Sequence, residues 1–165
     1  VLVRVRPGTF RFPSIDRPIV AVGPGTGVAP FRSLFNYRAH EASSPAPSLL
    51  FFGCRGRHRD FYFEGEWPSV RGVQVTAAFS RDDDNQGKKY VQDVMPEQAD
   101  TIWKAVASDE GTVLIAGSSG DMPKGVSSCL DEIASTMGWT SPDPKINSFV
   151  QYLETRGRIQ YETWS

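Results

Sequence analysis

A turn rich in glycine follows the first apolar run of the chain, in the stretch IVAVGPGTGVAPFRS at residues 19–33. Gly25, Thr26 and Gly27 lie between a strand pattern and a helix pattern, so backbone N–H groups and the positive end of a helix converge there. Such a turn binds anions, phosphate among them. The lysine that completes a P-loop is absent, because the letters VAP follow, so nucleotide hydrolysis is not supported. A tight structural turn without a ligand is the alternative.

The second apolar run ends in a cation, where a common NAD-binding fingerprint has an acid. In that fingerprint an Asp or Glu holds the ribose 2′-hydroxyl, whereas this run ends in the letters GCR, with Arg55 last. A guanidinium suits a phosphate instead. The alternative is a solvated surface arginine.

The third apolar run leads into a group of polar side chains. Ser80 and Arg81 end the run, and Lys88 and Tyr90 follow a polar loop. A hydroxyl, a guanidinium and an ammonium together can bind a phosphate monoester, and the tyrosine offers a flat face for adenine. If each cation makes a bond of roughly 1.5–3 kcal/mol, the pair favours NADPH over NADH by about 10²–10⁴-fold, less solvent screening. The aspartates at 82–84 weaken that preference, and an ordinary solvated loop is the alternative.

Two further segments border the same predicted site. The fourth apolar run ends in AGSSGDMP (residues 116–123), a second turn of small residues, and its position places it on the nicotinamide side of a dinucleotide cleft. The chain ends in YETWS, with Trp164 next to last. A large ring at a chain end is costly to expose and is usually packed on something. Core packing is the alternative to ligand contact.

Five short apolar runs must position these residues, and helical patterns alternate with them. The runs lie at residues 18–23, 48–53, 73–80, 112–117 and 158–164. Helices are predicted at residues 27–40, 60–67, 98–108, 122–137 and 143–155. This alternation is typical of an α/β fold with a doubly wound, five-stranded parallel sheet. In such a sheet ligands bind beyond the carboxyl ends of the strands, where the residues above lie.

The composition argues against several classes of function. The chain has 165 residues and a net charge of −1, and no predicted helix carries a basic stripe, so nucleic-acid binding is not indicated. Cys54 and Cys129 lack metal-ligand spacing, so we expect no metal site and no disulfide framework, and a reducing compartment fits best. No apolar run approaches the roughly 20 residues of a membrane span. We expect a soluble, cytoplasmic protein.

Five motifs occur in the same order as in a known family. They are GPGTGVAPFRS, FFGCR, AFSR, KKYVQ and the terminal TWS. Together they resemble the NADPH-binding domain of the diflavin reductases, a branch of the ferredoxin-NADP reductase superfamily. The stretches GCRGRHRDFYFEGEW and ETWS are most similar to the cytosolic NADPH-dependent branch, which passes electrons to an anamorsin-type iron–sulfur protein of cytosolic cluster assembly.

The resemblance implies two phosphate subsites. Thr26 and the flanking Gly25 and Gly27 would approach the NADPH pyrophosphate, with Arg55 nearby. The 2′-phosphate would be bound by a serine and two cations, namely Ser80, Arg81 and Lys88. The loop before the second cation is longer than usual, which leaves Lys88 and Lys89 as alternatives for that contact.

The resemblance also implies contacts to the two rings. Tyr90 would stack on adenine with help from Gln92, while Trp164 would cover the flavin ring and swing aside for hydride transfer. Glu162 takes the place of a supporting aspartate in some relatives. Two departures stand out: relatives often have Cys-Gly-Asp where this chain has AGS at 116–118, and Gly125 takes the place of a family aspartate.

The flavin-binding sequences of the family are not among these 165 residues. Residues 1–13, VLVRVRPGTFRFP, alternate like an edge strand. We therefore expect residues 1–13 to be the last strand and exit of a preceding FAD-binding domain, and residues 14–165 to be the NADP(H)-binding domain. Hydride would pass from NADPH to FAD, and electrons would continue through FMN to a protein acceptor. The chain alone is expected to bind NADPH without turning over.

Three alternatives stay open. The chain could come from another diflavin reductase, of the haem monooxygenase, methionine synthase or sulfite reductase type. A short-chain dehydrogenase predicts a catalytic Tyr-x-x-x-Lys, and the nearest match is Tyr152 with Arg156, which lacks the lysine. A non-catalytic domain that has lost nucleotide binding would leave the cation cluster and Trp164 unexplained.

Overall fold

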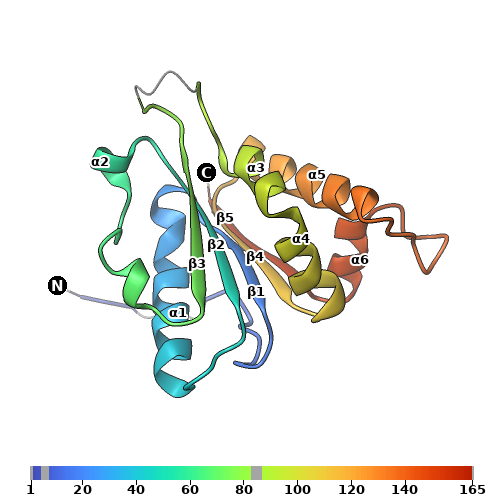
Figure 1. Cartoon of the computed structure of the whole chain (residues 1–165), viewed down its shortest axis with the longest axis horizontal. Helices are drawn as coiled ribbons and strands as arrows, with labels where there is room; N and C mark the ends of the chain where they lie inside the picture. The colour runs from blue at the N-terminus through green and yellow to red at the C-terminus, as the bar shows by residue number, and fades with distance from the viewer. Residues whose placement is uncertain (1, 5–7, 83–86, 165) are drawn as a thin grey trace.

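A computed structural model describes residues 2–4, 8–82 and 87–164. Its five strands form one all-parallel sheet in the order β3-β2-β1-β4-β5 (Figure 1). The strands are β1 (Ile19–Val22), β2 (Ser48–Cys54), β3 (Val73–Phe79), β4 (Thr112–Ser118) and β5 (Ile159–Trp164). The predicted α/β fold with a five-stranded parallel sheet is confirmed.

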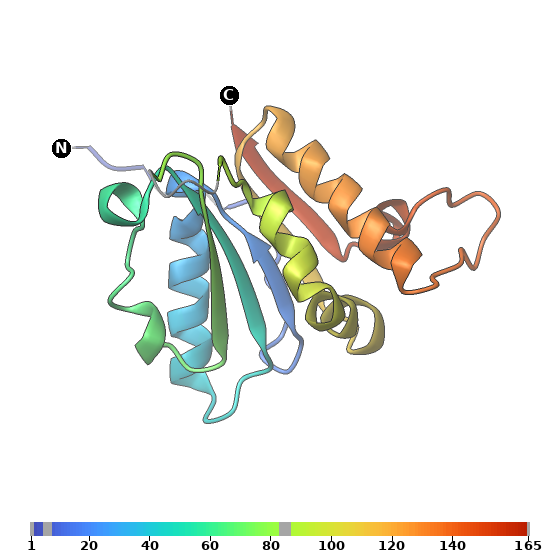
Figure 2. The ribbon, with the colours of Figure 1, turned by 45° about the horizontal axis from the view of Figure 1, so that its top comes forward.

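Helices cover both faces of the sheet, which is why the central strand β1 is apolar at every position. One face carries α1 (Ala29–Glu41), and the other carries α3 (Val91–Val94), α4 (Ala99–Trp103), α5 (Asp121–Thr136) and α6 (Phe149–Thr155) (Figures 1 and 2). All four residues of β1 are buried, and they alternate between the two faces. The carboxyl ends of all five strands therefore meet at one edge of the molecule.

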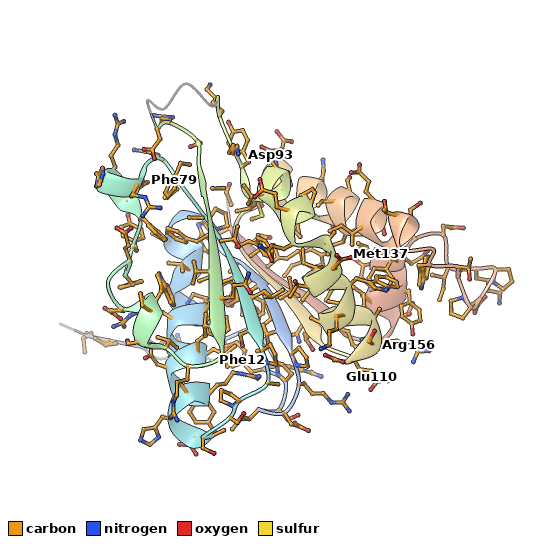
Figure 3. The ribbon with its side chains drawn as sticks, viewed as in Figure 1. Phe12, Phe79, Asp93, Glu110, Met137 and Arg156 are labelled. Atoms are coloured by element: carbon orange, nitrogen blue, oxygen red, sulfur yellow. The ribbon has the colours of Figure 1, made fainter. Side chains whose placement is uncertain are left out.

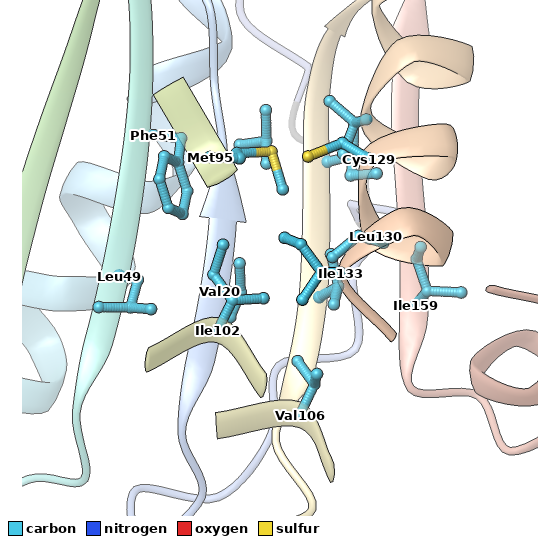
Figure 4. Close-up of a cluster of buried hydrophobic side chains, with 14 of the residues drawn as sticks. Val20, Leu49, Phe51, Met95, Ile102, Val106, Cys129, Leu130, Ile133 and Ile159 are labelled. Carbon is cyan, nitrogen blue, oxygen red and sulfur yellow. The ribbon is translucent and has the colours of Figure 1, made fainter. Parts of the chain in front are cut away.

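The larger core lies between the sheet and the helices α3 to α6 (Figure 4). There Val20 of β1, Phe51 of β2 and Ile159 of β5 face Met95 and Leu130 from the helical layer. The smaller core packs α1 on the opposite face of the sheet. These two apolar layers make the sheet a rigid base for its carboxyl edge.

The structure corrects two predicted helices and adds one that was not predicted. The last helix begins at Phe149, because Ser148 caps it with its Oγ at 3.2 Å from the Gln151 N–H, whereas the preceding residues form turns. Residue 143 precedes a proline, which disfavours helix. Between residues 60 and 67 the chain forms no helix; instead α2 (Arg57–Asp60) and a 3₁₀ turn, η2 (Trp67–Ser69), flank that stretch. The four-residue α3 was not predicted, since it is too short for a periodic signal.

The strand expected within residues 1–13 is absent from the part of that segment that the structure describes. Instead, the Arg11 backbone N–H donates to Gln160 Oε1 at 2.7 Å, and Gln160 Nε2 donates to the Arg11 carbonyl at 2.8 Å. A β-strand forms when its backbone pairs with the backbone of a neighbouring strand. Here the Arg11 backbone pairs instead with the side chain of Gln160 on β5. The assignment of residues 1–13 to a preceding domain stays a prediction.

A buried arginine closes the opposite end of the molecule. Arg38 of α1 is 2% exposed, and its guanidinium donates to four backbone carbonyls, those of Ser14, Ile15, Arg17 and Ala46, at 2.7 to 3.2 Å. Burial lowers the Arg38 pKa from its usual value, and the nearby Asp16 opposes that change. This contact joins the chain entering β1 to the chain entering β2. Across the described ranges, no helix is long and apolar enough to span a bilayer.

Candidate functional site

A cleft of about 750 Å³ lies at the carboxyl edge of the sheet. It is bounded by the chain segments that leave β1, β2, β3 and β4, which are the ones that sequence analysis selected. Its lining residues are Pro24, Gly25, Thr26, Gly53, Cys54, Arg55, Asp60, Tyr62, Ala78, Ser80, Lys89, Tyr90, Val91, Gln92, Ser118, Asp121 and Met122. Figure 3 labels Phe79 and Asp93 near this end of the molecule.

A row of three residues without large side chains lies at the base of the cleft, and two of them, Pro24 and Gly53, line it. Val22 of β1 is in register with Phe51 of β2 and with Ile115 of β4. Two residues further along each segment stand Pro24, Gly53 and Gly117. A Cβ on either glycine would come within 3.2 Å of the Pro24 ring. The absence of side chains at the two glycines makes room for the Pro24 ring, so the turn after β1 packs closely between β2 and β4.

The turn itself is a short 3₁₀ segment, η1 (Gly25–Val28), that leads directly into α1. Gly25 has a φ of +55°, a conformation that side chains disfavour. Gly27 is buried, and a Cβ on it would clash with the carbonyl oxygen of Ala116 on β4. Thr26 is exposed and lines the cleft. The turn therefore presents a hydroxyl and the start of a helix to the cleft, as an anion site requires.

One wall follows β2, and an acidic side chain holds it in place. The backbone N–H groups of Arg55 and Gly56 both donate to Asp60 Oδ1, at 2.8 and 3.1 Å. Tyr62 is 41% exposed and lines the cleft; its carbonyl accepts from the Trp67 indole at 3.0 Å, and its ring lies 6.3 Å from that of Phe52. Arg55 is exposed on the same wall. This wall thus combines a cation with an aromatic ring on a fixed backbone.

The opposite wall follows β3. Ser80 is held against β2 by its backbone N–H, which donates to the Cys54 carbonyl at 2.9 Å. The Lys89 backbone N–H donates to the Phe79 carbonyl at 3.1 Å, and its Nζ lies 3.9 Å from Glu97 Oε1. Tyr90 is 49% exposed and precedes α3, where Asp93 Oδ2 accepts its backbone N–H at 2.8 Å. A hydroxyl, an ammonium and a ring therefore share this wall.

Several predicted binding residues lie outside the cleft lining. Arg81 and Lys88 are both exposed, and Lys89 lines the cleft in place of its neighbour. Of the aspartates that flank this cluster, Asp82 accepts the Arg57 backbone N–H at 3.2 Å, while residues 83 and 84 lie outside the described residues. The roles assigned to these residues stay predictions.

Trp164 and Glu162 lie on β5 beside the cleft. Their partners across the strand pair are Ser118 and Ala116, and the Ser119 N–H donates to the Trp164 carbonyl at 2.8 Å. The Trp164 ring is 43% exposed, so core packing does not explain it. Ser118 lines the cleft, so residue 164 stands next to the β4 end of the cleft, and Trp164 is not itself among the lining residues.

Among the lining residues that sequence analysis did not name as binding residues, Asp60 and Tyr62 lie outside the segments that it placed at the cleft, whereas Pro24, Asp121 and Met122 lie within them. Pro24 gave a usable signal, since it stands among the glycines of the turn. Asp60 and Tyr62 belong to a stretch predicted to be helical, and only the observed turns bring them to the cleft. By contrast, Tyr152 and Arg156 lie on α6 and do not line it.

Comparison with known proteins agrees with this architecture. Residues 21–128 match the oxidoreductase NAD-binding domain family. The chain belongs to that family. In doubly wound sheets in general, ligands bind beyond the carboxyl ends of the strands, which is where the cleft lies.

The particular relatives confirm the predicted resemblance to the diflavin reductases. The chain is 40% identical to NADPH-dependent diflavin oxidoreductase 1 of Xenopus laevis, over 100% of the chain and 27% of that protein. It is 37% identical to the Arabidopsis thaliana protein of the same name, over 96% of the chain and 27% of the relative. It is 36% identical to NADPH–cytochrome P-450 reductase of Drosophila melanogaster, over 100% of the chain and 25% of the relative. The chain spans about a quarter of the length of these curated relatives.

Gly27→Ala should destabilise the fold by about 1–3 kcal/mol, because the added methyl group overlaps the Ala116 carbonyl. Urea unfolding measures the effect. Gly65→Ala is the matched control, since Gly65 is exposed and a Cβ there has no atom within 4 Å. Equal stability of the two variants would show that the close approach of the turn to β4 is not required.

Both thiols should resist alkylation in the folded protein. Burial raises the pKa of Cys54 to about 12, with Asp60 adding to the effect, and burial raises that of Cys129 to about 11. At pH 8 only about 10⁻⁴ and 10⁻³ of the two groups are thiolate, the reactive form. We expect slow labelling by a thiol reagent until urea is added. Because folding raises both pKa values, stability should fall as the pH rises from about 9 to 12.

Proposed function

We propose that this chain binds NADP(H) in the cleft and holds the nicotinamide toward a flavin on another domain of a longer reductase. The observation that carries the proposal is the floor of backbone at Pro24, Gly53 and Gly117, set between the turn at Thr26 and the cation-bearing walls. A dinucleotide needs close access to backbone, because its pyrophosphate lies against N–H groups at the start of a helix, and the turn at Gly25 and Thr26 stands at that place in the cleft.

The residues present fit this cofactor. The cleft volume falls within the range of about 300–1,000 Å³ that is usual for small-molecule sites. Arg55 and Lys89 can pair with phosphates, while Tyr62 and Tyr90 offer flat rings on opposite walls. No acid stands directly after β2, where an NAD-specific site would hold a ribose hydroxyl; Asp60 is already bonded to two backbone N–H groups. NADP(H) is therefore favoured over NAD(H).

The bound cofactor would supply hydride chemistry, and the protein supplies binding and orientation. In this proposal residues 14–165 form the nucleotide-binding domain, residues 1–13 lead out of an FAD-binding domain, and electrons continue through FMN to a protein acceptor. The names of the relatives support the diflavin class. The particular similarity to diflavin oxidoreductase 1 favours the branch that serves cytosolic iron–sulfur cluster assembly.

A cytoplasmic location belongs to the same proposal. Cys54 and Cys129 are both free and buried, which suits a reducing compartment. The other diflavin reductase types remain the rival assignment, and they share the nucleotide-binding step with the proposal.

Calorimetric titration of this chain tests the binding proposal directly. NADP⁺ and 2′,5′-ADP should bind at least about 100-fold more tightly than NAD⁺ and 5′-AMP, because two charge-assisted bonds to the 2′-phosphate are at stake. Equal affinity for both pairs would refute a 2′-phosphate site. No affinity for any of the four would support a domain that has lost nucleotide binding.

Adjacent lysines form a matched pair for locating the 2′-phosphate. Lys89→Ala should weaken NADP⁺ binding by about tenfold, since Lys89 lines the cleft and its partial exposure reduces the strength of a charge-assisted bond. Lys88→Ala should change it by less than about twofold. The reverse order of effects would assign the contact to Lys88, the other of the two lysines that the family resemblance leaves as alternatives.

Trp164→Ala should weaken discrimination against NADH in a reductase that contains both this chain and its flavin domain. Trp164 is 43% exposed and is paired with Ser118 at the β4 end of the cleft, and in this proposal loss of its ring would let either nicotinamide rest on the flavin. The ratio of kcat/KM for NADPH to that for NADH is the measurement. Trp164→Phe, which keeps a ring, should retain most of the preference. An unchanged ratio in Trp164→Ala would argue against the stacking role.

A further inference from the structure

We propose that Gly125 of α5 is a positioning residue for the nucleotide site, because it leaves the space in which Gln92 lies. The inference rests on the proposed function, since it assigns a new residue to the same cleft. Gln92 lines the cleft from α3, and α3 packs beside α5 (Figure 1). A Cβ at residue 125 would lie 3.2 Å from Gln92 Cδ and 3.3 Å from both Cγ and Nε2.

The backbone at residue 125 gives no other reason for a glycine. Gly125 lies within the 16-residue helix α5, and its φ is not in the left-handed region that favours glycine. Glycine is a poor helix former, and alanine is the best. What the missing side chain provides is room for the Gln92 amide against the backbone of α5.

Gln92 cannot yield to a new side chain by moving its backbone. Its neighbours Val91 and Val94 are 2% and 4% exposed, and Met95 is fully buried. Tyr90 and Asp93 fix the backbone at the start of α3, where the Asp93 N–H donates to the Tyr90 carbonyl at 3.0 Å. A methyl group at residue 125 would therefore press on the Gln92 side chain, which would have to shift by a few tenths of an ångström.

The Gln92 amide also has capacity for a further hydrogen bond. Its Oε1 is buried and accepts none from the residues that the structure describes. Buried polar atoms in proteins are nearly always paired, so an amide with an unpaired oxygen at the edge of a cleft suits a ligand that carries a hydrogen-bond donor. The amino group and the ribose hydroxyls of a nucleotide are such donors. Gly125 holds this amide where it can serve the cleft.

Three single variants and one double variant test the proposal on this chain. Gly125→Ala should keep or raise the Tm, because alanine favours the helix, and should raise the Kd for NADP⁺ by about five- to tenfold. Ser128→Ala is the matched control: it lies exposed on the same helix, so it should raise the Tm similarly without changing the Kd. Gln92→Ala should weaken binding, and Gly125→Ala should add nothing in that background. Wild-type affinity in Gly125→Ala, or an equal loss without Gln92, would overturn the proposal.

A crystal structure of Gly125→Ala without ligand separates this inference from the proposed function. A rotated Gln92 amide beside an unchanged α3 backbone is expected. An unmoved amide would refute the positioning role, even if NADP⁺ binds as proposed. Failure of the wild-type chain to bind NADP⁺, together with a displaced amide, would refute the proposed ligand and leave the packing relation between Gly125 and Gln92 intact.

Discussion

The close fit between the turn after β1 and the ends of β2 and β4 is the constraint on which the rest of the site depends. Gly27 lies against the carbonyl of Ala116, and Pro24 lies between Gly53 and Gly117. Side chains at these glycine positions would lift the turn off the sheet. The fit places the start of α1 over the carboxyl edge, and it leaves a floor of backbone that a phosphate chain can approach.

The two walls of the cleft reach their places by different means. A carboxylate, Asp60, gathers two backbone N–H groups behind β2, whereas the wall behind β3 is continued by ordinary strand-like bonds from Ser80 and Lys89 to the neighbouring backbone. In both walls hydrogen bonds fix the backbone, while the cationic side chains of Arg55 and Lys89 stay partly or fully exposed to solvent. Their affinity for a phosphate therefore comes from several weak, screened contacts in one cleft rather than from a single buried pair.

Membership of the oxidoreductase NAD-binding domain family accounts for the sheet and the glycine turn, but not for every contact in the cleft. Tyr62, Asp60 and the Gly125–Gln92 contact were recognised in the structure and depend on local packing. The chain spans about a quarter of the length of its curated relatives, and Trp164 stands at the end of β5, beside the cleft. In the proposed reductase, that ring would face the flavin domain.

The sequence by itself determined the five strands and most of the helices between them, because the central strands are buried on both faces and therefore form short apolar runs that end in glycine. It also identified the turn at Thr26, Arg55, Ser80 and Tyr90 as neighbours, since the carboxyl ends of parallel strands share one edge. Only the tertiary structure decided that Lys89 rather than Lys88 lines the cleft, that α6 begins at Phe149, and that Asp60 and Tyr62 form a wall. These depend on how loops and short turns pack against the sheet, and such contacts between residues distant in sequence leave no periodic pattern in the chain.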